Sequence, residues 1–527
     1  MINEICLKCQ VSSAWFFVLY AASHVFPKKG GLKMFYPTLD QVKELAKGNV
    51  LIPVSREVYA DTETPISLFK RFEDSEYCFL LESVENVEKW ARYSFIGRNP
   101  FLIVRSSGNT TTITDRNSGT REEEGNPIEI LKKLLESYKS ADVPGLPRFT
   151  GGAVGFFGYD LIRYYENLPD VPEDDLGLPE CHFMFVDEVL VFDHLKQKIH
   201  IIVNMRTNGS IERSYNSAVE RIKQIHKEIL SSRWKVSDAF RSETGAPKKS
   251  LKYFSNTTAE QFCENVLKAK QYIKDGDIFQ VVLSQRLCVE TDHDPFNVYR
   301  TLRVINPSPY MYYLKFEGYR LVGSSPEMLV RVENRIVETC PIAGTRKRGA
   351  TKEEDKLLEK ELLADEKELA EHTMLVDLGR NDIGKVSKYG TVVVKNMAHV
   401  ERYSHVMHIV SNIQGELRED KTPFDALMAV LPAGTLSGAP KIRAMEIIDE
   451  LERTKRGPYG GAIGYLSFNG NLDSCITIRT IIFKDKKAYI QAGAGIVADS
   501  VPEKEYEESL NKARALLKAL EEVDEIK

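Results

Sequence analysis

Cysteine and tryptophan are scarce in this sequence, with eight and three residues in a chain of 527. So few cysteines exclude the disulfide framework of small secreted proteins and favour a reduced, cytoplasmic setting. The pattern Cys6-x-x-Cys9 has no second half, so it indicates neither a zinc site nor a redox site. The length allows a large core and roughly two to four domains.

An excess of basic residues is also missing. The formal net charge is -5, and nucleic-acid partners usually need basic surfaces, so no nucleic acid is expected. The apolar run at residues 11–22 is shorter than the roughly twenty residues of a spanning helix, so no membrane partner is expected. A signal peptide is the second interpretation of this run, but the residues before it carry little of the positive charge that normally precedes such a region. The alternative that we favour is a start assigned too early, which makes residues 1–33 an extension outside the fold.

Several common catalytic motifs are absent. The sequence has no GxxxxGK[ST] phosphate loop, no dinucleotide fingerprint in a βαβ unit, no HExxH zinc helix and no GxSxG nucleophile elbow.

The predicted strands and helices occur in runs, without a repeat at a solenoid period. We predict strands at 77–83, 101–114, 151–158, 183–192, 198–204, 277–289, 310–316, 391–395, 405–412, 461–468, 474–484 and 487–497. We predict helices at 36–48, 211–230, 258–275, 351–378 and 441–452, and a last one that Ser500 caps and Pro502 opens. This order predicts an α/β fold of the α+β type, with antiparallel sheets packed face to face and flanked by helices.

A polar, turn-rich stretch at residues 237–252 is predicted to be a linker. It separates an N-terminal region, 34–236, from a C-terminal region, 253–522.

Two predicted helices carry glutamates three residues apart, Glu368 with Glu371 and Glu505 with Glu508. This spacing puts each pair on one helix face. A solvated face explains either pair, and Asp365 with Glu368 also resembles a helix cap. If the pairs converge, their carboxylates suit Mg²⁺, which is usually held by one or two carboxylates and by substrate oxygens.

A second group of residues suits an anionic ligand. Tyr459 follows Gly-Pro in a turn, and strand alternation puts Arg479 on the face opposite its isoleucine neighbours. That face is either solvated or part of a site, where a guanidinium matches a carboxylate. Gly493 and Gly495 allow a ligand to approach the backbone closely.

Histidine provides a third candidate. His405 and His408 lie on opposite faces of one predicted strand, so at most one of them faces a given site. A core position is the alternative, but a pKa near neutrality suits proton transfer beside a bound acid.

Long motifs then carry a family resemblance: residues 341–346 (PIAGTR), 365–378 (DEKELAEHTMLVDL), 436–441 (LSGAPK) and 457–461 (GPYGG). With them the chain resembles the chorismate-utilising enzymes over roughly residues 34–522, most strongly over 254–515, and within that family the anthranilate synthase component I branch. The resemblance implies the family's α/β fold of antiparallel sheets and helices.

The resemblance also implies a Mg²⁺-dependent lyase that converts chorismate and ammonia to anthranilate and pyruvate in tryptophan biosynthesis. It implies Glu371 and Glu508 as metal ligands, Glu368 as general acid, His408 as base and Thr435 as a further catalytic residue. The implied chorismate-binding residues are Gly344, Thr345, Tyr459, Arg479, Gly493, Ala494 and Gly495.

Two positions separate branches of the family. Water-activating relatives carry a lysine where this chain has Gln280, and aminodeoxychorismate synthases carry a nucleophilic lysine where it has Ala343. Without either lysine, ammonia attacks directly at C2, which favours anthranilate. The alternatives are aminodeoxychorismate synthase component I and a silent, tryptophan-binding regulatory subunit.

The resemblance extends to a feedback site for L-tryptophan, formed by Leu81, Glu82, Ser83, Pro309, Tyr310 and Met311. No cysteine lies in a glycine-rich elbow of the kind that hydrolyses glutamine, so a separate glutamine amidotransferase subunit is expected, in a heterotetramer.

Overall fold

The computed structural model describes residues 35–84, 92–169, 171–231, 251–403 and 406–525, and every structural statement below concerns these residues. Several sequence predictions therefore fall wholly or mostly outside the described residues. They concern the extension 1–33 with its CxxC pattern and apolar run, most of the linker 237–252, and His405.

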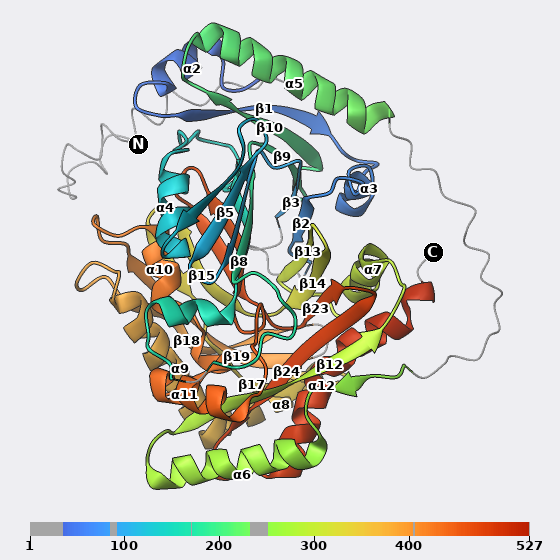
Figure 1. Ribbon diagram of the computed structural model, residues 1–527, viewed down its shortest axis with the longest axis vertical. Coiled ribbons are helices and arrows are strands. Elements are labelled where there is room, and N and C mark those ends of the chain that lie inside the picture. Colours follow the sequence, from blue (N-terminus) through green and yellow to red (C-terminus); the bar gives the residue numbers. More distant parts are fainter. Residues whose placement is uncertain (1–34, 85–91, 170, 232–250, 404–405, 526–527) are drawn as a thin grey trace, which may run out of the picture.

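Two large antiparallel sheets form the framework (Figure 1). Among the described residues, the first sheet runs in the order β1 (Leu51–Tyr59), β10 (Lys198–Arg206), β9 (Glu188–Asp193), β3 (Tyr93–Arg98), β2 (Cys78–Glu82), β13 (Tyr310–Phe316), β14 (Tyr319–Ser325), β23 (Thr480–Lys484), β24 (Lys487–Ile496), β12 (Gln280–Glu290) and β11 (Phe254–Ser255), with β20 (Gly438–Ala439) also paired to β12.

The second sheet runs in the order β17 (Ile342–Lys347), β19 (Val406–Glu416), β16 (Ile336–Thr339), β15 (Met328–Glu333), β22 (Leu472–Ile476), β21 (Ala462–Ser467), β7 (Gly152–Phe157), β8 (Cys181–Val186), β4 (Leu102–Ser107), β5 (Thr110–Asp115) and β6 (Gly119–Glu124), with β18 (Val393–Arg402) also paired to β19.

The two sheets pack face to face through a shared aromatic core. Phe149 packs against Tyr465 of the second sheet with 4.5 Å between ring centroids, and Phe156 of β7 contacts Phe316 of β13 with 5.9 Å between centroids. The same buried cluster takes side chains from strands of both sheets. Burying these large side chains provides most of the driving force for joining the sheets. The predicted fold class is confirmed.

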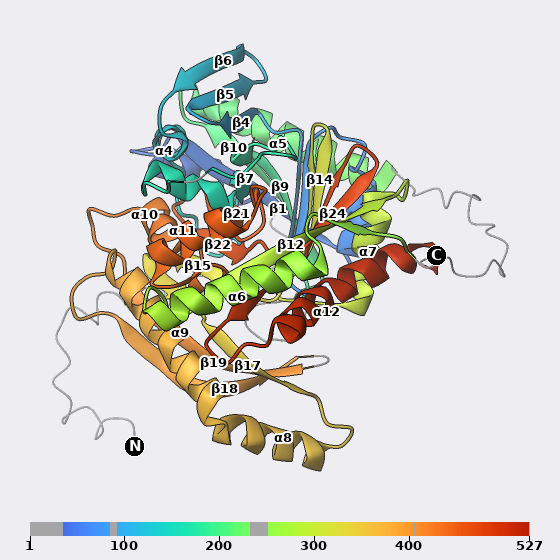
Figure 2. The same cartoon turned by 60° about the horizontal axis from the view of Figure 1, so that its bottom comes forward.

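Helices cover the outer faces: α2 (Leu39–Leu45), α3 (Pro65–Lys70), α4 (Pro127–Glu136), α5 (Ile211–Ser231), α6 (Ala259–Asp275), α7 (Pro295–Ile305), α8 (Lys352–Ala364), α9 (Glu366–Gly384), α10 (Pro423–Val430), α11 (Lys441–Leu451) and α12 (Pro502–Glu521), with short 3-10 turns at Tyr159–Tyr164, Gly434–Leu436 and Val523–Glu525. The helix α5 lies along β10, and α6 and α12 lie side by side over β12 and β24 (Figure 2). Over the described part of the chain, no helix is both long and apolar enough to cross a membrane.

Several predicted elements are divided in the structure. Residues 101–114 form the hairpin β4–β5, because Gly108 takes a left-handed φ of 56° between them. Residues 183–192 form β8 and β9, which belong to different sheets. A single-strand reading was wrong in both places, because an apolar run does not reveal where a chain turns or changes sheet.

Two predictions about helix ends also need correction. The tract 351–378 is two helices, because Asp365 ends α8 and caps α9 by accepting from the backbone N–H groups of Lys367 and Glu368. At the last helix Val501, not Ser500, is the N-cap. The Ser500 hydroxyl oxygen accepts instead from Val497 N–H at 3.1 Å. Pro502 opens α12 as predicted.

Strands from either side of the predicted linker form adjoining blocks in both sheets, and the two blocks pair at one junction in each sheet. In the first sheet β2 pairs with β13, and in the second β7 pairs with β21. The division into 34–236 and 253–522 stays a prediction, and both regions build both sheets.

Candidate active site and a second pocket

Arg479 lies where the chain crosses from one sheet to the other. The predicted strand 474–484 is divided into β22 and β23, which belong to different sheets. Arg479 sits between them in the left-handed region, with φ of 51°. The alternation expected across Arg479 is therefore wrong, because the strand stops before it.

Several ionisable groups lie close enough to Arg479 to influence its pKa. Burial lowers the pKa of Arg479, and the nearby Tyr459, Glu327 and Glu508 act in the opposite direction. A guanidinium in such surroundings can receive a carboxylate with two parallel hydrogen bonds.

The carboxylates of Glu371 on α9 and Glu508 on α12 lie within electrostatic reach of each other. Burial raises the pKa of Glu371, and the charges of Glu368 and Glu508 raise it further. The two helices belong to segments far apart in the sequence, yet the charge of one acid influences the pKa of the other. Two carboxylates that repel each other in this way suit a divalent cation, which would relieve the repulsion. Within the described ranges, no three His, Cys, Asp or Glu side chains gather as a metal cluster.

Lys512 is a cation in the site that the sequence did not single out. Its ammonium lies 2.7 Å from Glu508 Oε1, one helical turn away, and donates to the Gly493 carbonyl oxygen at 3.0 Å. It therefore joins α12 to the end of β24, and only its position beside Gly493 distinguishes it from other lysines on the helix.

Glu327 is a second residue that the sequence analysis missed. It follows β14 and precedes β15, and burial raises its pKa to about 7, while Thr435, Arg479 and Lys512 lower it. The Thr435 hydroxyl donates to Glu327 Oε1 at 3.1 Å. The sequence feature that could have pointed to Glu327 is an acidic residue in the short link between two apolar strands. A carboxyl group with a pKa near neutrality can hold and give a proton.

His408 on β19 is held by the backbone of β17. Its Nδ1 lies 2.9 Å from the Gly344 carbonyl oxygen and 3.1 Å from Thr345 Oγ1. Because a carbonyl only accepts, Nδ1 carries the hydrogen and Nε2 is left with its lone pair. Burial lowers the pKa of His408, and Arg479 lowers it further. A neutral imidazole with a free Nε2 is suited to act as a base.

Gly344 brings Glu368 close to this histidine. Gly344 has a φ of 66°, and a Cβ added there would lie 3.2 Å from Glu368 Oε2. A side chain at this position would be strained and would crowd the carboxylate. Glu368 itself makes an ion pair with Arg346 at 3.5 Å.

The end of β24 presents backbone amides to the same space. Residues 491–496 pair with β12 but not with β23, so one edge of this stretch has no strand beside it. The Gly493 carbonyl faces Lys512 on that edge, and Ser284 N–H, opposite Gly493, bonds to Glu452 instead. In an antiparallel pair the N–H of a residue points the same way as its C=O. The N–H groups of Gly493 and, two residues on, Gly495 therefore face the open edge, whereas that of Ala494 faces β12.

Tyr459 is anchored beside Arg479 by backbone hydrogen bonds. Gly460 N–H donates to Thr477 O at 3.0 Å, and Thr477 N–H donates to Gly461 O at 2.9 Å. Tyr459 is only 6% exposed, and burial raises its pKa to about 12, so the phenol stays protonated as a hydrogen-bond donor.

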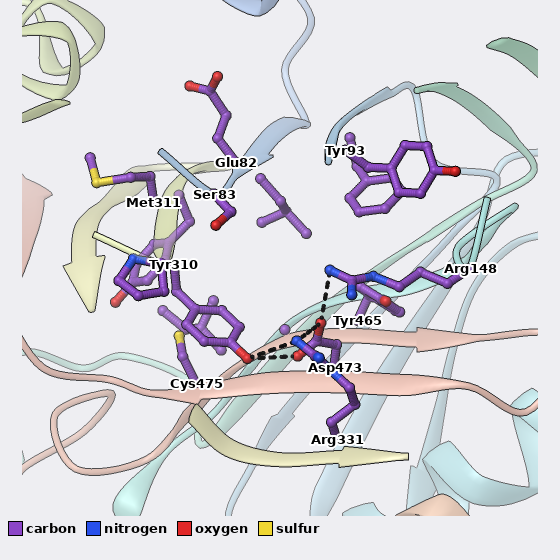
Figure 3. A pocket seen from close by; sticks show the side chains of 16 residues that line it. Glu82, Ser83, Tyr93, Arg148, Tyr310, Met311, Arg331, Tyr465, Asp473 and Cys475 are labelled. Carbon is purple, nitrogen blue, oxygen red and sulfur yellow. Dashed lines mark hydrogen bonds and ion pairs between the residues drawn. The ribbon is translucent and has the colours of Figure 1, made fainter. Parts of the chain in front are cut away.

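A second pocket lies apart from this site, and all six residues of the expected tryptophan site line it. Figure 3 shows Ser83 and Tyr310 at the cavity, whereas the Met311 side chain points away from it, on the same face of the sheet as its partner Glu82. The Ser83 hydroxyl is buried without a hydrogen-bond partner. The Glu82 carboxylate points away from the cavity (Figure 3) and accepts from Tyr299 OH at 2.5 Å. Strand alternation explains why Ser83 and Glu82 face opposite ways.

The floor of this pocket holds charges that the sequence did not reveal. Arg148 and Arg331 both pair with Asp473, at 3.3 and 3.1 Å, and Tyr310 OH donates to Asp473 Oδ1 at 2.9 Å (Figure 3). These residues come from distant parts of the chain, so no local pattern joins them.

The sequence and the fold of this chain are matched by known proteins. The family model described as chorismate binding enzyme matches residues 77–518, and the chain belongs to this family.

Its relatives point to one branch of the family. The chain is 75% identical to the anthranilate synthase component 1 of Acetivibrio thermocellus over 94% of this chain and 100% of that one. It is 47% identical to that of Aquifex aeolicus, over 93% and 98%. Among solved structures, it is similar to anthranilate synthase component I from Streptococcus pneumoniae, with a TM-score of 0.73 and 40% identity over 87% and 99%. The resemblance stated from the motifs is confirmed.

Proposed function

We propose that this chain is the large subunit of an anthranilate synthase, which converts chorismate and ammonia to anthranilate and pyruvate. The supporting observation is the set of charges near Arg479: Tyr459, Glu327 and Glu508 all influence its pKa, and the charge of Glu508 also raises the pKa of Glu371. A cation at the two glutamates and a guanidinium opposite would hold the two carboxylates of chorismate.

Glu371 and Glu508 are the proposed Mg²⁺ ligands. The repulsion between their carboxylates and the oxygen chemistry of the pair fit this ion. When bound, Mg²⁺ supplies positive charge that neutralises a substrate carboxylate in a protein of net charge -5.

Glu327 is the proposed proton donor in the first step, in which ammonia forms the C–N bond at C2 and the 4-hydroxyl leaves as water. Its pKa of about 7 keeps a proton available, and the Thr435 hydroxyl orients the carboxyl group. The earlier assignment of this role to Glu368 stays a prediction, and matched variants of the two glutamates separate them.

His408 is the proposed base in the second step. Its free Nε2 removes the proton from C2 as the C3–O bond breaks, the enolpyruvyl group leaves as pyruvate and the ring becomes aromatic. The hydrogen bond from Nδ1–H to Gly344 O would stabilise the imidazolium that forms.

Assaying the purified chain with chorismate, Mg²⁺ and ammonium tests this function. We expect a product with the fluorescence spectrum of anthranilate, with pyruvate in equal amount. The spectrum of aminodeoxychorismate instead would favour the alternative synthase, and the absence of any product would contradict both.

We further propose that the second pocket binds L-tryptophan and that this binding inhibits turnover. The buried, unpaired Ser83 hydroxyl offers a hydrogen bond, and aromatic side chains such as Tyr310 and Tyr465 offer an apolar surface for an indole ring.

Ser83→Ala tests the tryptophan site. We expect tryptophan to bind roughly tenfold more weakly, because one hydrogen bond of about 1–1.5 kcal/mol is lost. Direct calorimetry should show this change, while kcat without tryptophan stays at the wild-type value. Ser55→Ala, at a buried serine of β1, is a matched control and should change neither quantity. An inactive but folded Ser83→Ala protein would contradict a separate regulatory site.

The expected partner is a glutamine amidotransferase subunit that delivers ammonia. We expect the purified chain to form anthranilate with ammonium but not with glutamine alone. Turnover of glutamine by the chain without a partner would contradict this proposal.

A further inference from the structure

The two pockets are linked by a short series of hydrogen bonds centred on one buried serine. Ser324 is the last residue but one of β14, and its side chain is fully buried. The strand β14 lies between β13, which lines the second pocket, and β23, which begins directly after Arg479. Ser324 is therefore on the only strand between them in this sheet, as far as the described residues show.

On one side, the Ser324 hydroxyl holds the turn that leads into the second pocket. It donates to the Asn306 carbonyl at 2.5 Å, accepts from Asn306 Nδ2 at 2.9 Å and lies 2.9 Å from Ser308 Oγ. A hydroxyl offers one donor and two acceptor positions, so these contacts use it fully. The Ser308 carbonyl in turn accepts from Val84 N–H, next to Ser83, at 3.3 Å.

On the other side, the backbone N–H of Ser324 donates to the carbonyl oxygen of Arg479 at 3.0 Å. Arg479 has a left-handed backbone conformation that residues other than glycine rarely adopt. Its placement in the active site therefore depends on neighbours that hold this conformation, and Ser324 is one of them.

We propose that Ser324 couples the second pocket to the active site, so that a ligand bound beside Ser83 and Pro309 shifts β14 and changes how Arg479 holds its carboxylate. This inference rests on the proposed function, because it takes tryptophan and chorismate as the two ligands. The Asn306–Ser308 turn would move with the pocket, and the Ser324 hydroxyl would carry that movement to the strand beside Arg479.

Coupling between two sites is reciprocal, so it can be measured by binding alone. The affinity for tryptophan should be determined with and without chorismate, by calorimetry on the full chain with calcium in place of magnesium if turnover interferes. In the wild type we expect each ligand to weaken the other on the order of tenfold.

In Ser324→Ala we expect this factor to fall to within about twofold of unity, while tryptophan alone binds within a few-fold of wild type. The backbone hydrogen bond to Arg479 remains in this variant, so kcat without tryptophan should stay close to wild type. A structural defect would instead lower kcat or both affinities. Ser308→Ala removes only one contact of the same turn and serves if Ser324→Ala does not fold.

Ser325→Ala is the matched control. Ser325 is equally buried and adjacent, but its hydroxyl donates to Ile476 O at 2.7 Å and makes no contact with the Asn306–Ser308 turn. It should keep the wild-type coupling factor. A wild-type coupling factor in folded Ser324→Ala and Ser308→Ala would overturn the role of Ser324. So would a coupling factor that falls in Ser325→Ala as much as in Ser324→Ala. A wild-type protein in which tryptophan leaves chorismate affinity unchanged would instead overturn the proposed inhibition.

Discussion

Glu508→Gln is expected to reduce Mg²⁺-dependent turnover on the order of a thousandfold, because it removes several kcal/mol of charge stabilisation at the proposed metal. Glu371→Gln should behave alike, since each variant leaves only one carboxylate for the ion. The measurement is kcat over a magnesium titration, accompanied by calorimetric binding of Mg²⁺. Tryptophan binding should be unchanged, because the second pocket lies elsewhere.

Glu505→Gln is the matched control for this experiment. Glu505 lies one turn before Glu508 on α12, and its pKa is also raised by burial and by the charge of Glu508. If the loss of activity came only from removing a negative charge from this part of α12, Glu505→Gln would lose activity as well. Unchanged turnover in Glu508→Gln would contradict the ligand assignment and, with it, the proposed position of the substrate.

Glu327→Gln is expected to lower kcat by about 10²–10⁴, the usual contribution of a general acid. The wild-type kcat/KM should decline as pH rises through about 7, because Glu327 loses its proton there. That decline should disappear in the variant. Glu368→Gln is the comparison, and it should keep the decline if Glu327 is the donor. A decline that vanishes in Glu368→Gln and persists in Glu327→Gln would return the role to Glu368.

The same carboxyl group makes stability depend on pH. The pKa of Glu327 is raised in the folded state from an ordinary value of 4.5 to about 7, so the folded protein binds this proton more tightly than the unfolded chain. The resulting stabilisation is fully present below pH 4.5 and is lost as pH rises through about 7. The melting temperature of the wild type should therefore fall relative to Glu327→Gln across this interval, and a difference that is constant with pH would contradict it.

The sequence was most informative where a pattern is local. The helices α5 and α6 and the glutamate pairs at 368/371 and 505/508 follow from spacing within a single element, and the antiparallel sheets follow from the order of the predicted elements. The long motifs then identified the family. Local spacing places each glutamate pair on one helix face, whereas the choice of Glu371 and Glu508 as metal ligands came from the family resemblance.

Contacts between distant segments were not predictable in this way. Glu327 and Lys512 belong to the site only because β14, β24 and α12 meet there, and neither residue stands in a distinctive motif. The left-handed conformation of Arg479 was missed because the apolar residues on either side read as one strand. The Arg148–Asp473–Arg331 floor joins three separate segments, and its assembly follows from the sheet order.

The junction between early and late strands in each sheet bears on how the chain reaches its native state. The pairs β2–β13 and β7–β21 join residues more than 200 positions apart, as in Leu81 with Tyr312 and Phe157 with Ala462. Such a topology has a high contact order, which slows folding. A truncated chain beginning near residue 253 would leave the edges of β13 and β21 without their neighbours, and bare strand edges promote aggregation. Splitting the chain at the linker would therefore leave each product with one bare strand edge in each sheet, which the other product would have to cover.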